Sequence, residues 1–543
     1  MDSTFLAGVS GLQVHQRMLD ITGNNLANVN TTAYKSSRVN FSDMMSSTLR
    51  DASAPTASVG GTNPMQVGSG VQVASISRDM SQGSLMNTGQ PLDMAIDGAG
   101  YFVLNDGKMD VYTRVGAFAI DGDYYLVDPS TGARVQRVGT QGVADGFQAQ
   151  ESKDIRIPYD VGLQANATQN ISYGGNLSAD LLDPTTNLIA SGIRYTADQT
   201  VVDESTLLTD LSQASGLVAG DKLVLGGTLR DGTAIADTDF EIFDGSGDSK
   251  TMGDLLDAIQ ALYPDADVSL SDGNILVRDQ EAGYSKTDLS MTFSTAGDGS
   301  LEVPKYFKIV TAGGQAVKNT SLDIYDSQGT AQTLSASFVK TDTLNTWDLV
   351  ITSVTGDMEL LTRRIDGITF AEDGSFAGVT GDATSFEIKG IGDTQEIYLN
   401  LGTVTKYDGL SQMGGASTVT PGHQDGYAGG QLSSLSVGGD GVLEGLFTNG
   451  IRRDIASIKL ATFQNPSGLT SLGGNYYTIS ANSGDPTTEG VAGTVQGGSL
   501  EKSNVQTANE FINLIAAQNG YQVNARTIKV ATEMVTELVN LIR

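Results

Sequence analysis

The two ends of the chain carry apolar residues at helical spacing, whereas the long middle does not. Residues 3–28 and 503–543 place apolar side chains every three or four positions. The middle is rich in glycine, threonine and aspartate, and its short segments favour strands joined by turns. A long helix at each terminus has no core of its own, so it must bury its apolar stripe against the other helix or a neighbouring copy. The pattern therefore indicates an assembly protein.

The N-terminal helix is predicted to be weak in isolation. Gly8, Gly11 and Gly23 lie inside it, and each costs a helix about 1 kcal/mol relative to alanine. Small residues also let another backbone approach closely, so we expect this helix to become ordered when neighbours pack against it. Its apolar positions include Phe5, Val9, Leu12, Leu19 and Leu26.

The C-terminal helix carries a stronger signal. Ser503 and Gln506 have the spacing of a capping box, and Asn519-Gly520 predicts a bend or flexible joint. From Tyr521 onward apolar residues recur at every seventh position, with Ala531 between them, which is typical of a coiled-coil seam. A helix packed only on its own globular domain is the alternative, and the matching stretch at the other terminus argues against it. The apolar residues placed on this side are Phe511, Leu514, Tyr521, Ile528, Val535, Leu538 and Ile542.

The middle of the chain predicts β structure with one small α+β insertion. A polar connector, residues 31–91, precedes segments separated by Asp-Gly pairs, which are strong hairpin signals. Strand-like segments separated by turns recur near residues 432–479. The two distant blocks are therefore predicted to be halves of one domain. Residues 251–263 predict a short helix capped by Thr251 and Asp254, flanked by strand-like segments.

Composition narrows the class of function. The formal charge of -31 disfavours nucleic acid as a partner. The chain has no cysteine, which excludes disulfides and thiolate chemistry. No apolar run of about twenty residues predicts a membrane span, and the N-terminus lacks the pattern of a cleaved signal peptide.

Motifs for chemistry are almost absent. His15 and His423 have no neighbouring nucleophile or carboxylate motif, and no nucleophile elbow, phosphate-binding loop or zinc-protease motif occurs. The acidic run 244–257 lacks the ligand spacing of a calcium loop. The sequence therefore predicts no catalytic site, no cofactor and no metal, and it argues against an enzyme.

Two terminal stretches resemble the flagellar rod and hook protein family. ITGNNLANVNTTAYKSSRVNF at 21–41 is similar to the N-terminal signature, and LEKSNVQTANEFINLIAAQNGYQVNARTIKVATEM at 500–534 is similar to the C-terminal one. Residues 424–450 and 458–477 resemble the hook members more than the shorter rod members, and 174–180 resembles their entry into an outer domain. The family motif maps onto Asn24, Asn25, Leu26, Ala27, Asn28, Ser503, Asn504 and Asn524.

The resemblance implies a multidomain fold, mainly β, with outer domains nested on an α-helical coiled-coil domain formed by both chain ends. Hook-type members line a central channel with their terminal helices and carry β domains at larger radius. The implied domains are 1–30 with 503–543, the connector 31–91, 92–169 with 398–502, 170–190 with 300–397, and an outer insertion at 191–299.

The resemblance also implies function. A hook-type member is a structural subunit that self-assembles into the flagellar hook, the tubular joint that transmits torque from motor and rod to filament. Export is by the flagellar type III apparatus, so the implied location is the hook of the basal body, extracellular after export. The implied partners are other copies of the chain, the distal rod protein, the hook cap protein and the hook-filament junction protein, with no nucleic acid and no membrane insertion. A distal rod or hook-filament junction protein is the alternative, and an enzyme or adhesin on a flagellar scaffold would need a site at 217–290, where none is visible.

Overall fold

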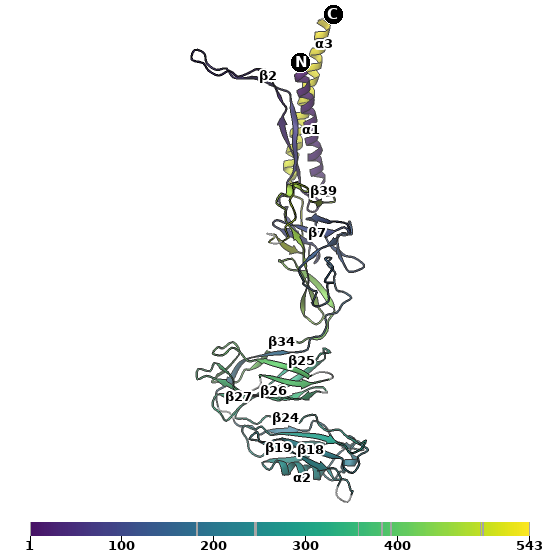
Figure 1. The fold of residues 1–543 in the computed structure, drawn as a ribbon, viewed down its shortest axis with the longest axis vertical. Coiled ribbons are helices and arrows are strands. Elements are labelled where there is room, and N and C mark those ends of the chain that lie inside the picture. The colour runs from purple at the N-terminus through teal and green to yellow at the C-terminus, as the bar shows by residue number, and fades with distance from the viewer. Residues whose placement is uncertain are drawn as a thin grey trace. The chain divides into compact units, whose positions relative to one another are not determined.

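The computed structural model divides the chain into two compact units (Figure 1). It describes residues 2–180, 183–243, 247–356, 358–381, 384–390, 394–488, 490 and 493–541. Unit 1 comprises Met1–Leu163 and Gly430–Arg543, and unit 2 comprises Gln164–Gly429. The described residues form three α-helices and many short strands. The chain is therefore a multidomain, mainly β protein, as the sequence predicts.

The two terminal helices lie side by side in unit 1 (Figure 1). They are α1 (Asp2–Ala27) and α3 (Thr507–Leu541). α3 is not interrupted at Asn519-Gly520, where the sequence predicts a bend or flexible joint, since the helix continues through both residues. Glycine is tolerated in a helix when a close neighbour requires it, and α1 is that neighbour here.

The predicted cap at Ser503 is also wrong, because α3 begins only at Thr507. The preceding segment is still extended and bonded to the connector. The Asn504 backbone N donates to Tyr34 O at 3.2 Å, and the Lys502 backbone N donates to Ser84 O at 2.9 Å. The helix therefore begins only after the residues that make these contacts.

The connector contains strands that the sequence did not predict. They have few buried side chains, so hydrophobic alternation is weak there. A two-stranded sheet joins β1 (Ser37–Asp43) to β4 (Val71–Arg78), and a hairpin between them joins β2 (Ser46–Arg50) to β3 (Met65–Gly68). β5 (Leu85–Asn87) pairs with β42 (Ser499–Glu501), close to the start of α3.

The two distant β blocks of unit 1 share their sheets. Figure 1 shows the purple-blue N-terminal half of this block interleaved with its yellow-green C-terminal half. A cluster that includes Tyr101, Tyr112, Phe463 and Tyr477 packs the halves together. The cross-block antiparallel pairs are β6 (Met94–Asp97) with β41 (Thr494–Gly497), β7 (Tyr101–Asn105) with β38 (Leu460–Ala461), β8 (Asp110–Thr113) with β40 (Tyr476–Thr478), and β12 (Arg137–Val138) with β37 (Arg452–Ile458).

Unit 2 contains two hydrophobic cores. One lies under a five-stranded antiparallel sheet and includes Trp347, which is fully buried. A second sheet contributes to the same core, and its strand β13 (Asn170–Ser178) pairs in parallel with β32 (Thr394–Asn400) and β33 (Leu410–Met413). The five-stranded sheet runs β25 (Val317–Tyr325), β26 (Ala331–Lys340), β27 (Thr346–Val354), β29 (Arg364–Phe370) and β30 (Phe376–Val379).

The other core of unit 2 belongs to the α2 module, defined here as residues 185–314 outside the undescribed positions. α2 (Met252–Leu262) has the predicted capping box, in which the Thr251 side chain accepts from the Asp254 backbone N. Leu255, Leu256 and Ile259 are buried on its inner face. Its strands include β14 (Leu188–Ala190), β18 (Lys222–Thr228), β21 (Asn274–Asp279), β22 (Asp288–Ser294) and β24 (Lys308–Thr311).

Residues 398–424 lie in unit 2, although they are predicted to share a domain with 92–169. Their strands β33 and β34 (Thr420–Gln424) pair with β13 inside unit 2. Parallel pairing joins segments far apart in the chain, so local patterns gave no indication of it.

Candidate assembly site

α1 and α3 run antiparallel and pack tightly at glycines. A Cβ added at Gly11 would lie 2.6 Å from Asn524 Oδ1 of α3. A Cβ added at Gly520 would lie 2.4 Å from His15 Cε1 of α1. Real Cβ atoms do not approach neighbours this closely, so glycine allows the two backbones to come together.

The predicted assembly residues differ in exposure. A half-buried group comprises Val9, Leu12, Leu19, Leu26, Leu514 and Ile528. An exposed group comprises Phe5, Phe511, Tyr521, Val535 and Leu538. Ile542 lies outside the described residues. The exposed group leaves apolar surface on the helices, and its role in assembly stays a prediction.

Two buried helix residues were not predicted as assembly residues. Val14 of α1 is 4% exposed, and Ala517 of α3 is fully buried. Ala517, Asn524 and Ala531 recur at every seventh position, so α3 turns a row of small and polar side chains towards α1. The larger apolar residues stand beside this row. The seven-residue spacing of small residues was the sequence signal that could have predicted this row.

Two family-motif asparagines tie the connector to the helices. Asn25 Nδ2 donates to Ser37 O at 2.8 Å, and the Ser37 backbone N donates back to Asn25 Oδ1 at 2.9 Å. The Ser36 backbone N donates to Asn504 Oδ1 at 2.8 Å, and Asn504 Nδ2 donates to Asp79 O at 2.9 Å. An amide side chain can donate and accept at once, so each asparagine substitutes for a missing backbone partner.

The other motif residues act within the helices or beside them. Asn28 Nδ2 donates to Asn24 O at 2.9 Å at the end of α1. Asn524 Nδ2 donates to Gly520 O at 2.8 Å within α3. The Val505 backbone N donates to Ser503 Oγ at 3.3 Å. Leu26 is half-buried and Ala27 is exposed.

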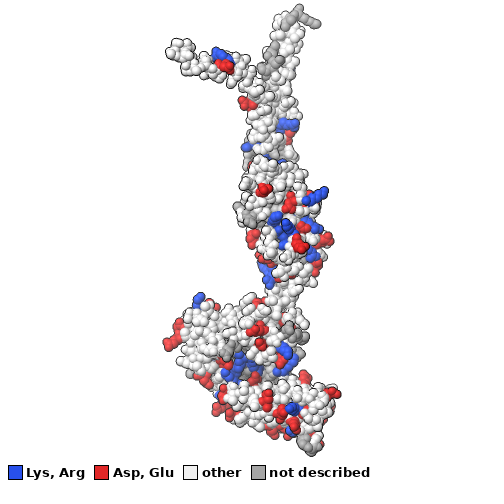
Figure 2. Space-filling model, in the orientation of Figure 1, with Lys and Arg blue, Asp and Glu red and all other residues white. Residues whose placement is uncertain are grey.

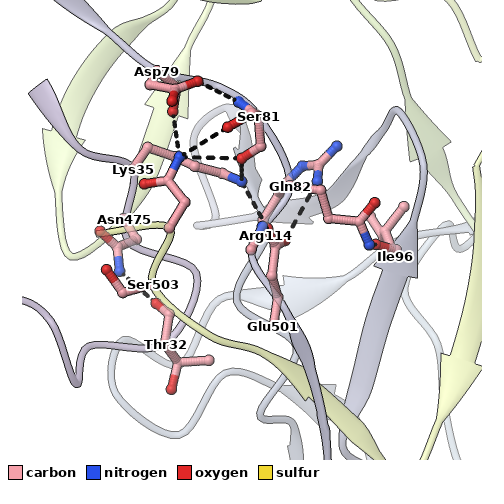
Figure 3. A network of polar contacts seen from close by, with 12 residues as sticks. Thr32, Lys35, Asp79, Ser81, Gln82, Ile96, Arg114, Asn475, Glu501 and Ser503 are labelled. Carbon is pink, nitrogen blue, oxygen red and sulfur yellow. Dashed lines mark hydrogen bonds and ion pairs between the residues drawn. The ribbon is translucent and has the colours of Figure 1, made fainter. Parts of the chain in front are cut away.

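A buried ion cluster lies between the connector, the β block and β42 of unit 1 (Figure 3). Lys35 Nζ donates to Glu501 Oε1 at 2.7 Å, and Arg114 Nη1 donates to Glu501 Oε2 at 3.4 Å. The Gly83 backbone N also donates to Glu501 Oε1, at 2.7 Å. The Lys35 and Glu501 side chains are 1% and 0% exposed. Burial lowers the pKa of Lys35, and the charge of Glu501 opposes that shift.

This cluster joins three parts of unit 1. Lys35 belongs to the connector, Arg114 follows β8 in the β block, and Glu501 ends β42. A buried carboxylate needs charged or hydrogen-bonding partners, and Glu501 finds them in all three parts. The contacts hold the bases of both terminal helices against the β block. No local sequence signal predicts these contacts, because the partners lie far apart in the chain.

The β2–β3 hairpin and the free faces of the helices expose apolar side chains. Figure 1 shows the hairpin extending away from α1, and Figure 2 shows few charged side chains on the visible face of the helix pair. A groove of 860 Å³ between α1 and β4 is lined by both apolar and polar residues, among them Leu6, Val9, Gln13 and Arg17. The exposed hairpin residues include Met45, Leu49, Val59, Met65 and Val67.

The two histidines lie in different units of the chain. His15 of α1 packs against Gly520 of α3 and Phe41 of β1, whereas the His423 backbone N donates to Ser172 Oγ at 2.8 Å in unit 2. Within the described part of the chain, no group of three histidine or acidic side chains is placed to hold a metal ion. No described helix is long and apolar enough to cross a membrane.

Four family descriptions match successive parts of the chain. "Flagella basal body rod protein" matches residues 5–35, and "Flagellar hook protein FlgE/F/G D1 domain" matches 95–179. "Flagellar basal body protein FlaE D2 domain" matches 298–427, and "Flagellar basal body rod FlgEFG protein C-terminal" matches 496–542. Together with the paired terminal helices, these matches define an axial protein of the bacterial flagellum.

Full-length relatives specify which axial protein. The chain is 30% identical over 550 residues to the flagellar hook protein FlgE of Borreliella burgdorferi, with 100% of both chains covered. It is likewise 30% identical over 554 residues to FlgE of Treponema pallidum, again with 100% of both covered. The chain belongs to the flagellar hook protein family, and it is a structural subunit of the hook of the flagellar basal body.

A solved structure of Helicobacter pylori flagellar hook protein FlgE2 also aligns with the chain. The alignment has a TM-score of 0.40 and 19% identity, and it covers 76% of this chain and 99% of the other.

Proposed function

We propose that the chain polymerises into the torque-transmitting tube of the hook, with α1 and α3 forming a coiled coil at its inner wall. The observation that carries this proposal is the antiparallel α1–α3 pair, which packs through small residues and leaves larger apolar residues exposed on α3. Neighbouring exposed apolar side chains on a folded protein mark an interaction site. Copies of the same pair are suitable partners, because they carry the same apolar surface.

The proposal extends to the domains and their order. Residues 1–30 with 503–543 form the inner coiled coil, 31–91 form the connector, 92–169 with 425–502 form the first β domain, 170–190 with 300–424 form the second, and 191–299 form the outer insertion. The cross-block strand pairs and the two cores of unit 2 support a nested plan, and the pairing of β33 and β34 with β13 supports residues 398–424 as part of the second β domain.

The proposed partners of the chain follow from the position of the hook between the rod and the filament. The chain would contact the distal rod protein at one end of the hook, and the hook cap protein and the hook-filament junction protein at the other. Export by the flagellar type III apparatus would place it outside the cell. The absence of cysteine favours this route, since no disulfide can trap the chain before export.

Electron microscopy of hook-basal bodies tests the proposal. A strain that lacks its hook gene is complemented with this chain, and antibody to the chain is applied to the purified particles. We expect label along the whole hook and restored swimming. Label confined to the rod or to the hook-filament junction would instead support the alternative role.

A further inference from the structure

The contact between α1 and α3 is built from matched small and large side chains. Gly11 of α1 receives Asn524 of α3, and Gly520 of α3 receives His15 of α1. At a third level, a Cβ added at Gly8 would lie 2.9 Å from Ile528 Cγ1. Each helix therefore supplies glycine notches, the spaces over Gly8, Gly11 and Gly520, and also side chains that fill the notches of its partner.

These pairs specify one register. The contacts on α1 advance from Gly8 to His15 while those on α3 go back from Ile528 to Gly520. The spacing between successive contacts agrees on the two helices to within one residue. A slip of one turn in one direction would oppose His15 to Asn524. A slip in the other direction would place Gly11 opposite Gly520 and leave both notches empty.

His15 is held by shape and not by a hydrogen bond through Nδ1. Its Nδ1 is buried and has no hydrogen-bond partner among the described residues. The ring meets Phe41 of β1 edge to face, with 6.1 Å between ring centroids. The imidazole thus fills the space between Gly520 and the connector, where a smaller side chain would leave a void.

We infer that His15 and Gly520, with Gly11 and Asn524, lock the register of α1 on α3. Within the assembled hook the pair then stays one rigid unit, so movement during rotation occurs between subunits and not between the two helices. This inference rests on the proposed role of the two helices at the inner wall. It assigns His15 a positioning role and gives the two notch glycines a packing reason.

A volume exchange tests the lock. Gly520→Ala should abolish hook assembly, although alanine has the higher helix propensity. Adding His15→Ala should restore hook assembly in part, because it removes the ring that the new Cβ would contact but leaves a void of the kind that large-to-small substitutions create. Gly23→Ala is the matched control and should assemble normally, since no atom lies within 4 Å of a Cβ there. Normal assembly of the Gly520→Ala chain would overturn the inference.

A disulfide tests whether the register persists in rotating hooks. The chain has no cysteine, so Gly8→Cys with Ile528→Cys introduces a single possible bridge, and the Gly8 Cβ would lie within disulfide reach of position 528. We expect this bridge to form in assembled hooks with swimming unchanged. Gly8→Cys with Val535→Cys, two turns out of register, should remain reduced.

Two results would overturn the inference. One is bridging of the out-of-register pair as efficiently as the in-register pair. The other is swimming that stops on oxidation and returns on reduction, which would show that the helices must slide. Failure of the proposed hook role is separate, since it would appear as an absence of antibody label on hooks built with the unaltered chain.

Discussion

Lys35 Nζ donates a 2.7 Å hydrogen bond to Glu501 Oε1, although 466 residues separate the two in the sequence. Both side chains are buried, and Arg114 approaches the other Glu501 oxygen (Figure 3). A buried charge cluster of this kind contributes little net stability, but it strongly penalises loss of one member. The cluster therefore specifies how the connector and the last strand meet before α3 begins.

Removing the shared carboxylate should loosen the base of the helix pair. Glu501→Gln leaves Lys35 and Arg114 buried without their anion, at an expected cost of about 3–5 kcal/mol. Amide exchange in β5 and β42 should accelerate accordingly. Asp20→Asn removes an exposed pair with Arg17, whose side chain is 68% exposed, and should cost less than about 1 kcal/mol. Equal effects of the two changes would contradict the role given to Glu501.

Unit 2 should show pH dependence that originates at Asp348. Burial raises the pKa of the Asp348 carboxyl above its usual 3.8, against hydrogen bonds from Tyr284 and Gly367 that lower it, and the nearby charge of Asp366 raises it further. Between 3.8 and the raised pKa, the folded state binds more protons than the unfolded state. The Asp348 contribution to stability is therefore present at low pH and is lost as pH rises through this window.

The comparison with Asp348→Asn isolates this contribution. Many other carboxyls in the chain titrate, so the quantity to measure is the difference in unfolding free energy between the two proteins as pH varies. The fluorescence of Trp347, the single tryptophan of the chain and fully buried beside Asp348, reports unit 2 alone. The advantage of the unchanged chain over the variant should shrink as pH rises above 3.8. A difference independent of pH would refute the assignment.

The apolar face of α3 should matter for assembly and not for folding. Val535 is 44% exposed, so Val535→Asp should change monomer stability by less than about 1 kcal/mol. In the hook the same charge would be buried without a partner, which costs several kcal/mol. We expect secretion without polymerisation. Gln522→Asp, on the exposed polar face of the same helix, is the control, and hooks of normal length with Val535→Asp would remove Val535 from the interface.

Local signals predicted local structure well. The Thr251 and Asp254 pair predicted the α2 cap because both partners lie within one turn. The faces of α1 and α3 were harder, because both small and large residues recur at helical spacing, and only the partner decides which ones are buried. Ala517 is buried while Tyr521 is exposed, so volume matched to α1 prevailed over hydrophobicity. The Lys35–Glu501 contact had no local signal at all.

Amide exchange should separate the free subunit from the hook. A helix with internal glycines and little buried surface is marginal alone, so the amides of Leu12 and Ile528 should exchange quickly in the monomer and slowly after polymerisation. Val495, paired with Ile96 between β41 and β6, should be protected in both forms. Equal protection of Leu12 in monomer and hook would show that the pair is already stable before assembly.

The α2 module should be removable without loss of tube formation, provided that the cut follows its sheets. The Thr185 backbone N donates to Gly314 O at 3.0 Å, so the two ends of the module lie side by side. Deleting residues 186–313 and joining these ends with a short glycine-serine linker removes the whole module core except Val339 and Val350, which belong to the neighbouring sheet.

A narrower cut gives the contrasting variant. Deleting residues 217–290 removes β18 and severs β22, which pairs with it along its length, and it would expose the buried side chains of the remaining strands. We expect the wide deletion to be exported and to build tubes of altered curvature or stiffness, measured by electron microscopy and swimming speed, whereas the narrow deletion should be degraded before export. If the wide deletion forms no tube, the module carries essential assembly contacts; if its hooks match the unaltered ones in shape and swimming, it has no part in the mechanics of the joint.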